Sequence, residues 1–194
     1  PTFADEFNSF TPNADWWPQY PWGPLLSGVS LGIATPNNIS VNSGVLSLTP
    51  QKQSVTYNGV NYDYTMGVIS NTQLFGYGFY EMKAKLPKGQ GYHSAFWTIH
   101  AASPCTYEEI DIMEMHGGHS VETEIFMPNH HYRSTVLPNC PRDHDPIPHD
   151  TKQDLSQNFH TYGLSYLPGE LTWYFDGKVV RRLAVTSSYP YPSL

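Results

Sequence analysis

Apolar and polar side chains alternate along most of this chain, and short turn signals interrupt the alternation. A period of two residues is typical of half-buried β-strands, and a two-residue turn of Asn-Gly or Asp-Gly between such strands is typical of a hairpin. We therefore expect hairpins around Ser43-Gly44, Asn58-Gly59 and Asp176-Gly177. Further strands are expected at 66–70, 75–86, 92–99, 107–114, 121–126 and 158–166.

Two stretches lack this alternation. Residues 16–24 are rich in proline and tryptophan and predict an irregular loop, whose aromatic side chains either close one end of the core or stack on sugar rings. Residues 138–154 contain several prolines, histidines and aspartates. Short His and Asp spacing can bind a metal, but no rigid motif frames these residues, and we expect a solvated surface loop.

Composition agrees with an all-β protein. The chain has 15 Gly, 17 Pro and 14 Tyr, and only 14% of its residues are charged. A chain of 194 residues is long enough for one domain with a substantial core, so we expect a single domain over residues 1–194. Alternation and hairpins together predict a β-sandwich of two curved antiparallel sheets, bent so that one face forms a concave groove.

The segment from Tyr107 to Glu114 carries the candidate chemistry. In a regular strand Glu109 and Asp111 share one face, while Ile110 and Ile112 enter the core. Glu114 lies five residues after Glu109 and would point into the core, where an unpaired carboxylate is costly. We therefore predict a β-bulge at Ile112-Met113 that returns Glu114 to the acidic face. The alternative is a solvated strand face that happens to carry acids.

Three carboxylates on one face hold their protons unequally, so that one stays protonated while another is ionised. Retaining glycoside hydrolysis uses such a pair, one as nucleophile and one as general acid, with the carboxyl groups about 5 Å apart. The segment resembles the Glu-x-Asp-x-x-Glu signature of glycoside hydrolase family 16, the laminarinase-like β-glucanases and related galactanases, in its bulged form. This resemblance implies that Glu109 is the nucleophile, Glu114 the acid/base and Asp111 the neighbour that tunes both.

The resemblance extends from about Asp5 to Arg182 and implies a jelly-roll, concanavalin-like sandwich. The strand ending in Ala95-Phe96-Trp97 is similar to a family strand, which makes Trp97 a candidate for sugar stacking, with a core tryptophan as the alternative. His93 stands where relatives frequently place a tryptophan, and His131 lies near a histidine position of the family, with a surface-loop histidine as the alternative. Both are candidate substrate-binding residues. The family usually continues into further strands, so we expect a domain incomplete at its C-terminus.

The net charge of the chain limits the classes of polymer that it is expected to bind. The formal net charge is −7, from 17 acidic and 10 basic residues, and no basic run occurs, which disfavours nucleic acid and densely sulfated polysaccharides. No apolar run reaches the ~20 residues of a membrane span. We expect a neutral polysaccharide substrate, a secreted protein, no required cofactor and no metal in the site. The sequence leaves a structural calcium and the oligomeric state open.

The sequence leaves open which of three activities the protein has and whether its two cysteines form a disulfide. Our first hypothesis is an endo-acting retaining hydrolase of β-1,3- or mixed β-1,3/1,4-glucan. A galactan hydrolase of the agarase or carrageenase type and a non-catalytic polysaccharide-binding module are the alternatives. Clustered like charges favour catalysis, since binding alone needs amides, hydroxyls and aromatics. Cys105 and Cys140 could close a disulfide beside the groove or remain two thiols.

Overall fold

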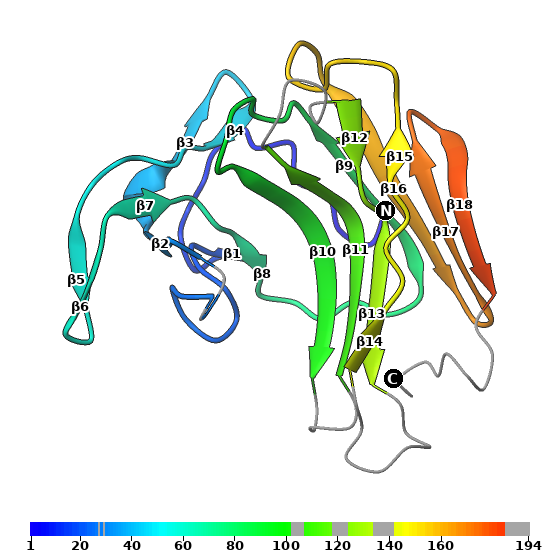
Figure 1. The fold of residues 1–194 in the computed structure, drawn as a ribbon, viewed down its shortest axis with the longest axis horizontal. Coiled ribbons are helices and arrows are strands. Elements are labelled where there is room, and N and C mark those ends of the chain that lie inside the picture. The colour runs from blue at the N-terminus through cyan, green and yellow to red at the C-terminus, as the bar shows by residue number, and fades with distance from the viewer. Residues whose placement is uncertain (27, 29, 102–106, 118–123, 134–141, 185–194) are drawn as a thin grey trace. The chain divides into compact units, whose positions relative to one another are not determined.

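The computed structural model describes residues 1–26, 28, 30–101, 107–117, 124–133 and 142–184 (Figure 1). The chain divides into two compact units, Pro1–Phe75 and Gly76–Leu194. Nearly all regular structure in the described part is β, apart from one 3-10 turn at Pro36–Asn38, and no described helix has the length and apolar character of a membrane span. The expectation of one domain over residues 1–194 stays a prediction.

The first unit is built of short strand pairs. Antiparallel pairs join β1 (Trp16–Trp17) to β8 (Ser70–Asn71), β3 (Ile39–Asn42) to β4 (Val45–Leu48) and β5 (Val55–Tyr57) to β6 (Val60–Tyr62), and β2 (Gly32–Ala34) is parallel to β7 (Tyr64–Met66). Both predicted hairpins of this unit are confirmed, because Ser43 and Asn58 have φ of 52° and 49° and each is followed by a glycine at positive φ.

The strand expected at 66–70 is wrong, since regular pairing stops at Met66 and resumes at Ser70. Gly67 explains the break. A Cβ on Gly67 would lie 2.7 Å from the carbonyl oxygen of Asn38, so the chain passes the β3–β4 hairpin too closely for a side chain.

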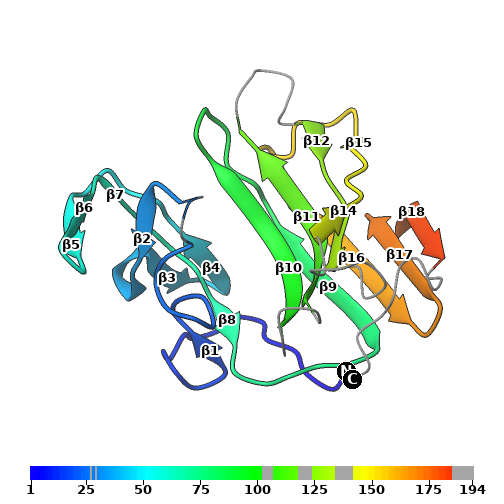
Figure 2. The same cartoon turned by 60° about the horizontal axis from the view of Figure 1, so that its bottom comes forward.

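The second unit holds two four-stranded antiparallel sheets (Figures 1 and 2). The first sheet has the order β10 (His93–Ala101), β11 (Tyr107–His116), β13 (Asn129–Arg133), β14 (Arg142–His144). The second has the order β18 (Lys178–Ala184), β17 (Glu170–Phe175), β16 (His160–Leu167), β9 (Gly78–Ala84). A two-stranded pair, β12 (Ile125–Phe126) with β15 (His149–Asp150), completes this unit.

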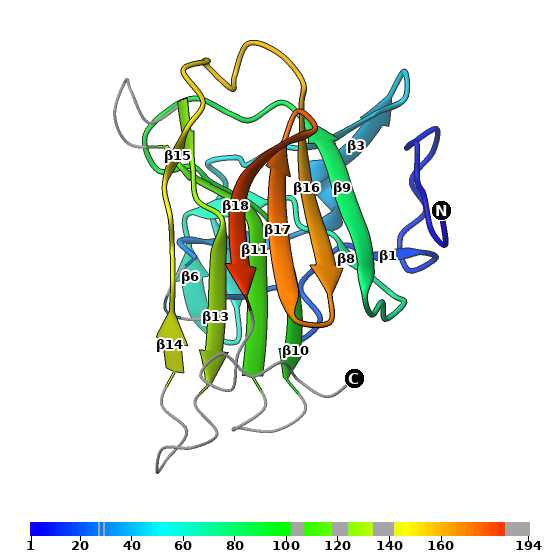
Figure 3. The same cartoon turned by 90° about the vertical axis from the view of Figure 1, so that its right-hand side faces the viewer.

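The two sheets face each other as layers, which Figure 3 shows with the second sheet toward the viewer. Buried side chains of both sheets form one hydrophobic core: Ile110, Ile112, Met113 and Met115 of β11, Tyr162, Leu164 and Tyr166 of β16, and Leu171, Trp173 and Phe175 of β17. The predicted turn at Asp176-Gly177 is present, with φ of 47° and 72°. The predicted all-β sandwich is therefore confirmed.

Two further strand assignments differ from the sequence prediction. The expected loop at 138–154 contributes β14 and β15, and His131 lies in a strand that local signals did not indicate. Pro146 and Pro148 fall between these two short strands and therefore remove no ladder hydrogen bond. Pairing with β13 and β12 orders a segment whose composition alone predicts a loop. Among the described residues of 121–126, only Ile125–Phe126 is strand.

Candidate active site

The predicted bulge is present in β11. The pairing of β10 with β11 runs regularly until Trp97 lies opposite Asp111, and the next residue pair is Phe96 with Met113. Ile112 therefore has no partner on β10, and Ile112 and Met113 are both buried in the core. The extra residue changes the parity of β11, as expected of a bulge.

This register places the three predicted carboxylates on one face of the sheet. Alternate residues of a strand share a face, and Ala95, Trp97 and Ile99 of β10 are such a series. Their partners on β11 are Glu114, Asp111 and Glu109, in that order. Residues directly opposite one another also share a face, so the acids line one surface beside Trp97. The side chains of Glu109 and Glu114 are 16% and 14% exposed.

Glu109 and Asp111 share a histidine from β13. His131 lies directly opposite Glu109, and its Nε2 is 3.7 Å from Glu109 Oε1 and 3.2 Å from Asp111 Oδ2. Asn129, opposite Asp111, places its Nδ2 2.7 Å from the same His131 Nε2. The hydroxyl of Tyr107 donates to Glu109 Oε2. Glu109 is thus held by groups from two strands, and its position is fixed before any substrate arrives.

Glu114 has a different environment. Its Oε1 is 3.0 Å from Nε2 of His93, and its backbone exchanges hydrogen bonds with Met127, which fixes the strand beyond the bulge. Partial burial raises the pKa of Glu114, but the hydrogen bond and charge of His93, with weaker contributions from His116 and His131, outweigh burial. The net pKa of this carboxyl lies below its usual range.

The opposite face of β11 carries an acid that the sequence prediction did not use. Glu108 is 5% exposed, and its Oε1 is 2.9 Å from Nε2 of the fully buried His130. Alternation alone assigns Glu108 to the core side, but only the register of β13 reveals the histidine that pairs with it. This pair satisfies a buried carboxylate and lies on the core side of the sheet, away from Glu109 and Asp111.

The structure thus brings together all six predicted site residues: Glu109, Asp111, Glu114, Trp97, His93 and His131. The sequence prediction missed Tyr107, Asn129 and His116 on the same face. Tyr107 stands two residues before Glu109, so alternation could have identified it. Asn129 and His116 could be placed only once the strand pairing was known. Cys105 and Cys140 lie outside the described residues.

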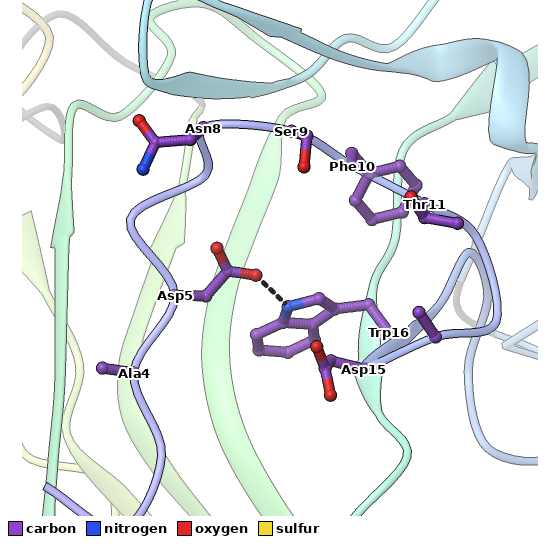
Figure 4. A pocket seen from close by; sticks show the side chains of 9 residues that line it. Ala4, Asp5, Asn8, Ser9, Phe10, Thr11, Asp15 and Trp16 are labelled. Carbon is purple, nitrogen blue, oxygen red and sulfur yellow. Dashed lines mark hydrogen bonds between the residues drawn. The ribbon is translucent and has the colours of Figure 1, made fainter.

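The first unit has a separate hollow, shown in Figure 4, with a volume of about 240 Å³. Asp5 lines it, but Asp5 Oδ2 accepts a hydrogen bond of 2.8 Å from Trp16 Nε1 and Oδ1 accepts one from the backbone of Phe7. The carboxylate is therefore engaged in holding this part of the chain together, and the clustered carboxylates of β11 remain the candidate catalytic centre.

Comparison with known protein families shows which family this chain belongs to. The family model described as the glycoside hydrolase family 16 domain of β-porphyranases A–D matches residues 1–192. The chain belongs to glycoside hydrolase family 16. The chain is 30% identical to the endo-1,3-1,4-β-glycanase ExsH of Rhizobium meliloti, over 98% of this chain and 44% of ExsH. The chain thus spans less than half the length of this curated relative.

Solved structures share the fold of this chain. The laminarinase catalytic domain of Thermotoga maritima is 28% identical, with a TM-score of 0.67 over 77% of this chain and 61% of that domain. LamAcat of Zobellia galactanivorans is 23% identical, with a TM-score of 0.80 over 97% of this chain and 81% of that structure. The second likeness shows the fold alone.

Proposed function

We propose that this chain carries the catalytic centre of an endo-acting retaining glycoside hydrolase that cleaves β-1,3- or mixed β-1,3/1,4-glucan. The observation that carries this proposal is the bulge at Ile112, which places Glu114 on the same face as Glu109. Without it, Glu114 would point into the core, and a double displacement would lack its acid.

Each carboxylate has a role that its surroundings support. Glu109 attacks the anomeric carbon, and its contacts with Tyr107 and His131 hold it in place for the attack. Glu114 donates a proton to the leaving oxygen and afterwards takes one from water. Asp111 lies between the two glutamates along the strand face, 2% exposed, and tunes both electrostatically. Trp97, opposite Asp111, provides the apolar surface for a sugar ring.

The proposed substrate class rests on the net charge of the chain and on the described activity of its relatives. The net charge of −7 disfavours a densely sulfated polymer, and ExsH is described as acting on 1,3-1,4-β-glycans. The matching family model is, however, that of β-porphyranases. A galactan is therefore the second candidate substrate. We further propose that the protein is secreted and that the chemistry needs no cofactor, because two carboxylates suffice for double displacement.

Substitution of the two glutamates tests the roles. Glu109→Ala should abolish the glycosyl-enzyme on every substrate, with a loss of at least about 10⁴-fold in kcat/KM. Glu114→Ala should lose natural polymer hydrolysis but retain glycosylation by aryl glycosides with activated leaving groups, because these need little protonation. Glu81→Ala, an exposed glutamate of β9, is the matched control and should keep full activity. Equal losses on both substrate types in both site variants would contradict the assignment.

Product analysis tests the substrate. The purified protein is incubated with laminarin, lichenan, agarose, porphyran and carrageenan, and reducing ends and the anomeric configuration of the first product are measured. Release of β-anomers from laminarin or lichenan is the expected result. Release only from the galactans would replace the glucan assignment, and binding without hydrolysis at any pH would indicate a binding module.

A further inference from the structure

His93 and His116 form a histidine pair beside Glu114. They lie directly opposite each other across β10 and β11, and their rings stack with centroids 4.3 Å apart and an interplanar angle of 26°. Glu114 stands two residues before His116, on the same face, with Oε1 at 3.0 Å from His93 Nε2. One ligand atom from each of these three residues lies within 4.8 Å of the other two.

Two imidazole nitrogens and one carboxylate oxygen form a ligand set that favours a divalent transition metal. Zinc binds such ligands at about 2.0–2.1 Å in a tetrahedral arrangement and leaves the fourth position to water where the site is open. The side chain of His93 is 37% exposed, so solvent reaches this position. Ligand atoms around a tetrahedral zinc lie roughly 3.4 Å apart, so these side chains need to approach each other by only about an ångström.

We propose that His93, Glu114 and His116 bind a divalent transition metal such as Zn²⁺ or Cu²⁺, and that the bound ion blocks the hydrolase. The blocking part rests on the proposed function. A metal on Glu114 occupies the oxygen that must carry the proton to the leaving group, and a charge of +2 on this carboxylate disfavours its protonated form. The ion is therefore an inhibitor of this site and has no step in the hydrolysis.

A second cluster on the same face, Glu109, Asp111 and His131, is the competing location. It is less suited to a transition metal. It offers one imidazole, and His131 Nε2 already lies 2.7 Å from Asn129 Nδ2. Asp111 is 2% exposed, and Glu109 accepts a hydrogen bond from Tyr107. An ion bound at this second cluster would have to displace these contacts.

Direct binding measurements test the site without reference to activity. Calorimetric titration of the purified protein with ZnCl₂ in a non-chelating buffer should give one site, and electron paramagnetic resonance of bound Cu²⁺ should show two nitrogen ligands. His116→Gln should weaken Zn²⁺ binding about tenfold or more and leave one nitrogen ligand on Cu²⁺. His93→Gln should do the same, so either variant can serve if the other folds poorly. His131→Gln is the matched control and should keep the affinity.

Inhibition is measured on the same proteins. Zn²⁺ should inhibit the wild type reversibly, with activity restored by chelation, and the inhibition constant should rise in His116→Gln by the same factor as the dissociation constant. Unchanged Zn²⁺ affinity in both His116→Gln and His93→Gln, or a loss confined to His131→Gln, overturns the proposed site. Binding with the expected ligand pattern but without inhibition upholds the site and contradicts the acid/base role of Glu114.

Discussion

At the scale of single residues, the acid/base candidate is surrounded by three imidazoles. His93, His116 and His131 all favour the ionised form of Glu114 and together outweigh the effect of its burial. A general acid must enter the reaction protonated, so these neighbours restrict the pH range in which Glu114 can donate. The sequence prediction named His93 as a candidate substrate-binding residue, at a position where relatives frequently place a tryptophan. In the structure, His93 contacts the carboxylate of Glu114 and lowers its pKa.

Removing His93 should therefore change the pH dependence. The acid loses its proton as pH rises through its pKa, which sets the alkaline limb of kcat/KM against pH. His93→Gln removes the largest influence that lowers the pKa of Glu114, so this pKa rises and the alkaline limb moves to higher pH. The measurement is the pH profile of kcat/KM in metal-free buffer. An alkaline limb that stays in place or moves to lower pH would show that His93 does not set the protonation of Glu114.

At the scale of elements, the bulge in β11 determines which side chains meet. It adds one residue without a partner, and the indole nitrogen of Trp173 in the facing sheet donates a hydrogen bond of 2.9 Å to the carbonyl oxygen of Asp111, immediately before it. A bulge disrupts the strand ladder locally, and a buried carbonyl without a partner would be costly. The second sheet thus supports the irregular backbone that the chemistry needs.

Deletion of Ile112 tests this interpretation. The remaining strand would place Glu114 four residues after Glu109, which keeps both on one face of a regular strand. We expect a folded but less stable protein, by about 2–5 kcal/mol for the lost core side chain, that retains hydrolysis of the natural polymer, which Glu114→Ala loses. Insertion of one alanine between Phe96 and Trp97 is the control, because it gives Ile112 a partner and regular parity then directs Glu114 to the core. A folded deletion variant with no activity beyond that of Glu114→Ala would contradict this account.

The bulge could be predicted from the sequence because it follows from parity: two carboxylates five residues apart cannot share a face of a regular strand. The three hairpins followed from local turn chemistry in the same way. β13, β14 and β15 could not be predicted, since their backbone hydrogen bonds go to strands distant in sequence. Asn129 and the Glu108–His130 pair were missed for this reason, because only the pairing of β11 with β13 brings them together.

At the scale of the second unit, one arginine connects the last described strand to the edge of the sheet β10-β11-β13-β14, which carries the candidate catalytic residues and is called the catalytic sheet below. Arg181 of β18 is 5% exposed and lies over the ring of Trp173, 4.5 Å from its centroid. Its Nη1 donates to the carbonyl oxygens of Pro128 and Asp145, and its Nη2 to Asp145 Oδ2 at 2.6 Å. These acceptors flank β13 and β14, so Arg181 joins the two layers near the strand that carries His131.

Arg181→Met should therefore destabilise the protein far more than Arg182→Met. Methionine keeps much of the apolar contact with Trp173 but leaves two carbonyl oxygens and Asp145 without their donor, which costs about 2–4 kcal/mol. Arg182 pairs with Glu170 on the surface, where the two side chains are 57% and 45% exposed, and Arg182→Met should cost under about 1 kcal/mol. Urea unfolding of both variants measures the difference. Equal losses would mean that the inter-sheet contacts of Arg181 contribute no more than a surface ion pair, and that hydrophobic packing alone holds β18 against the catalytic sheet.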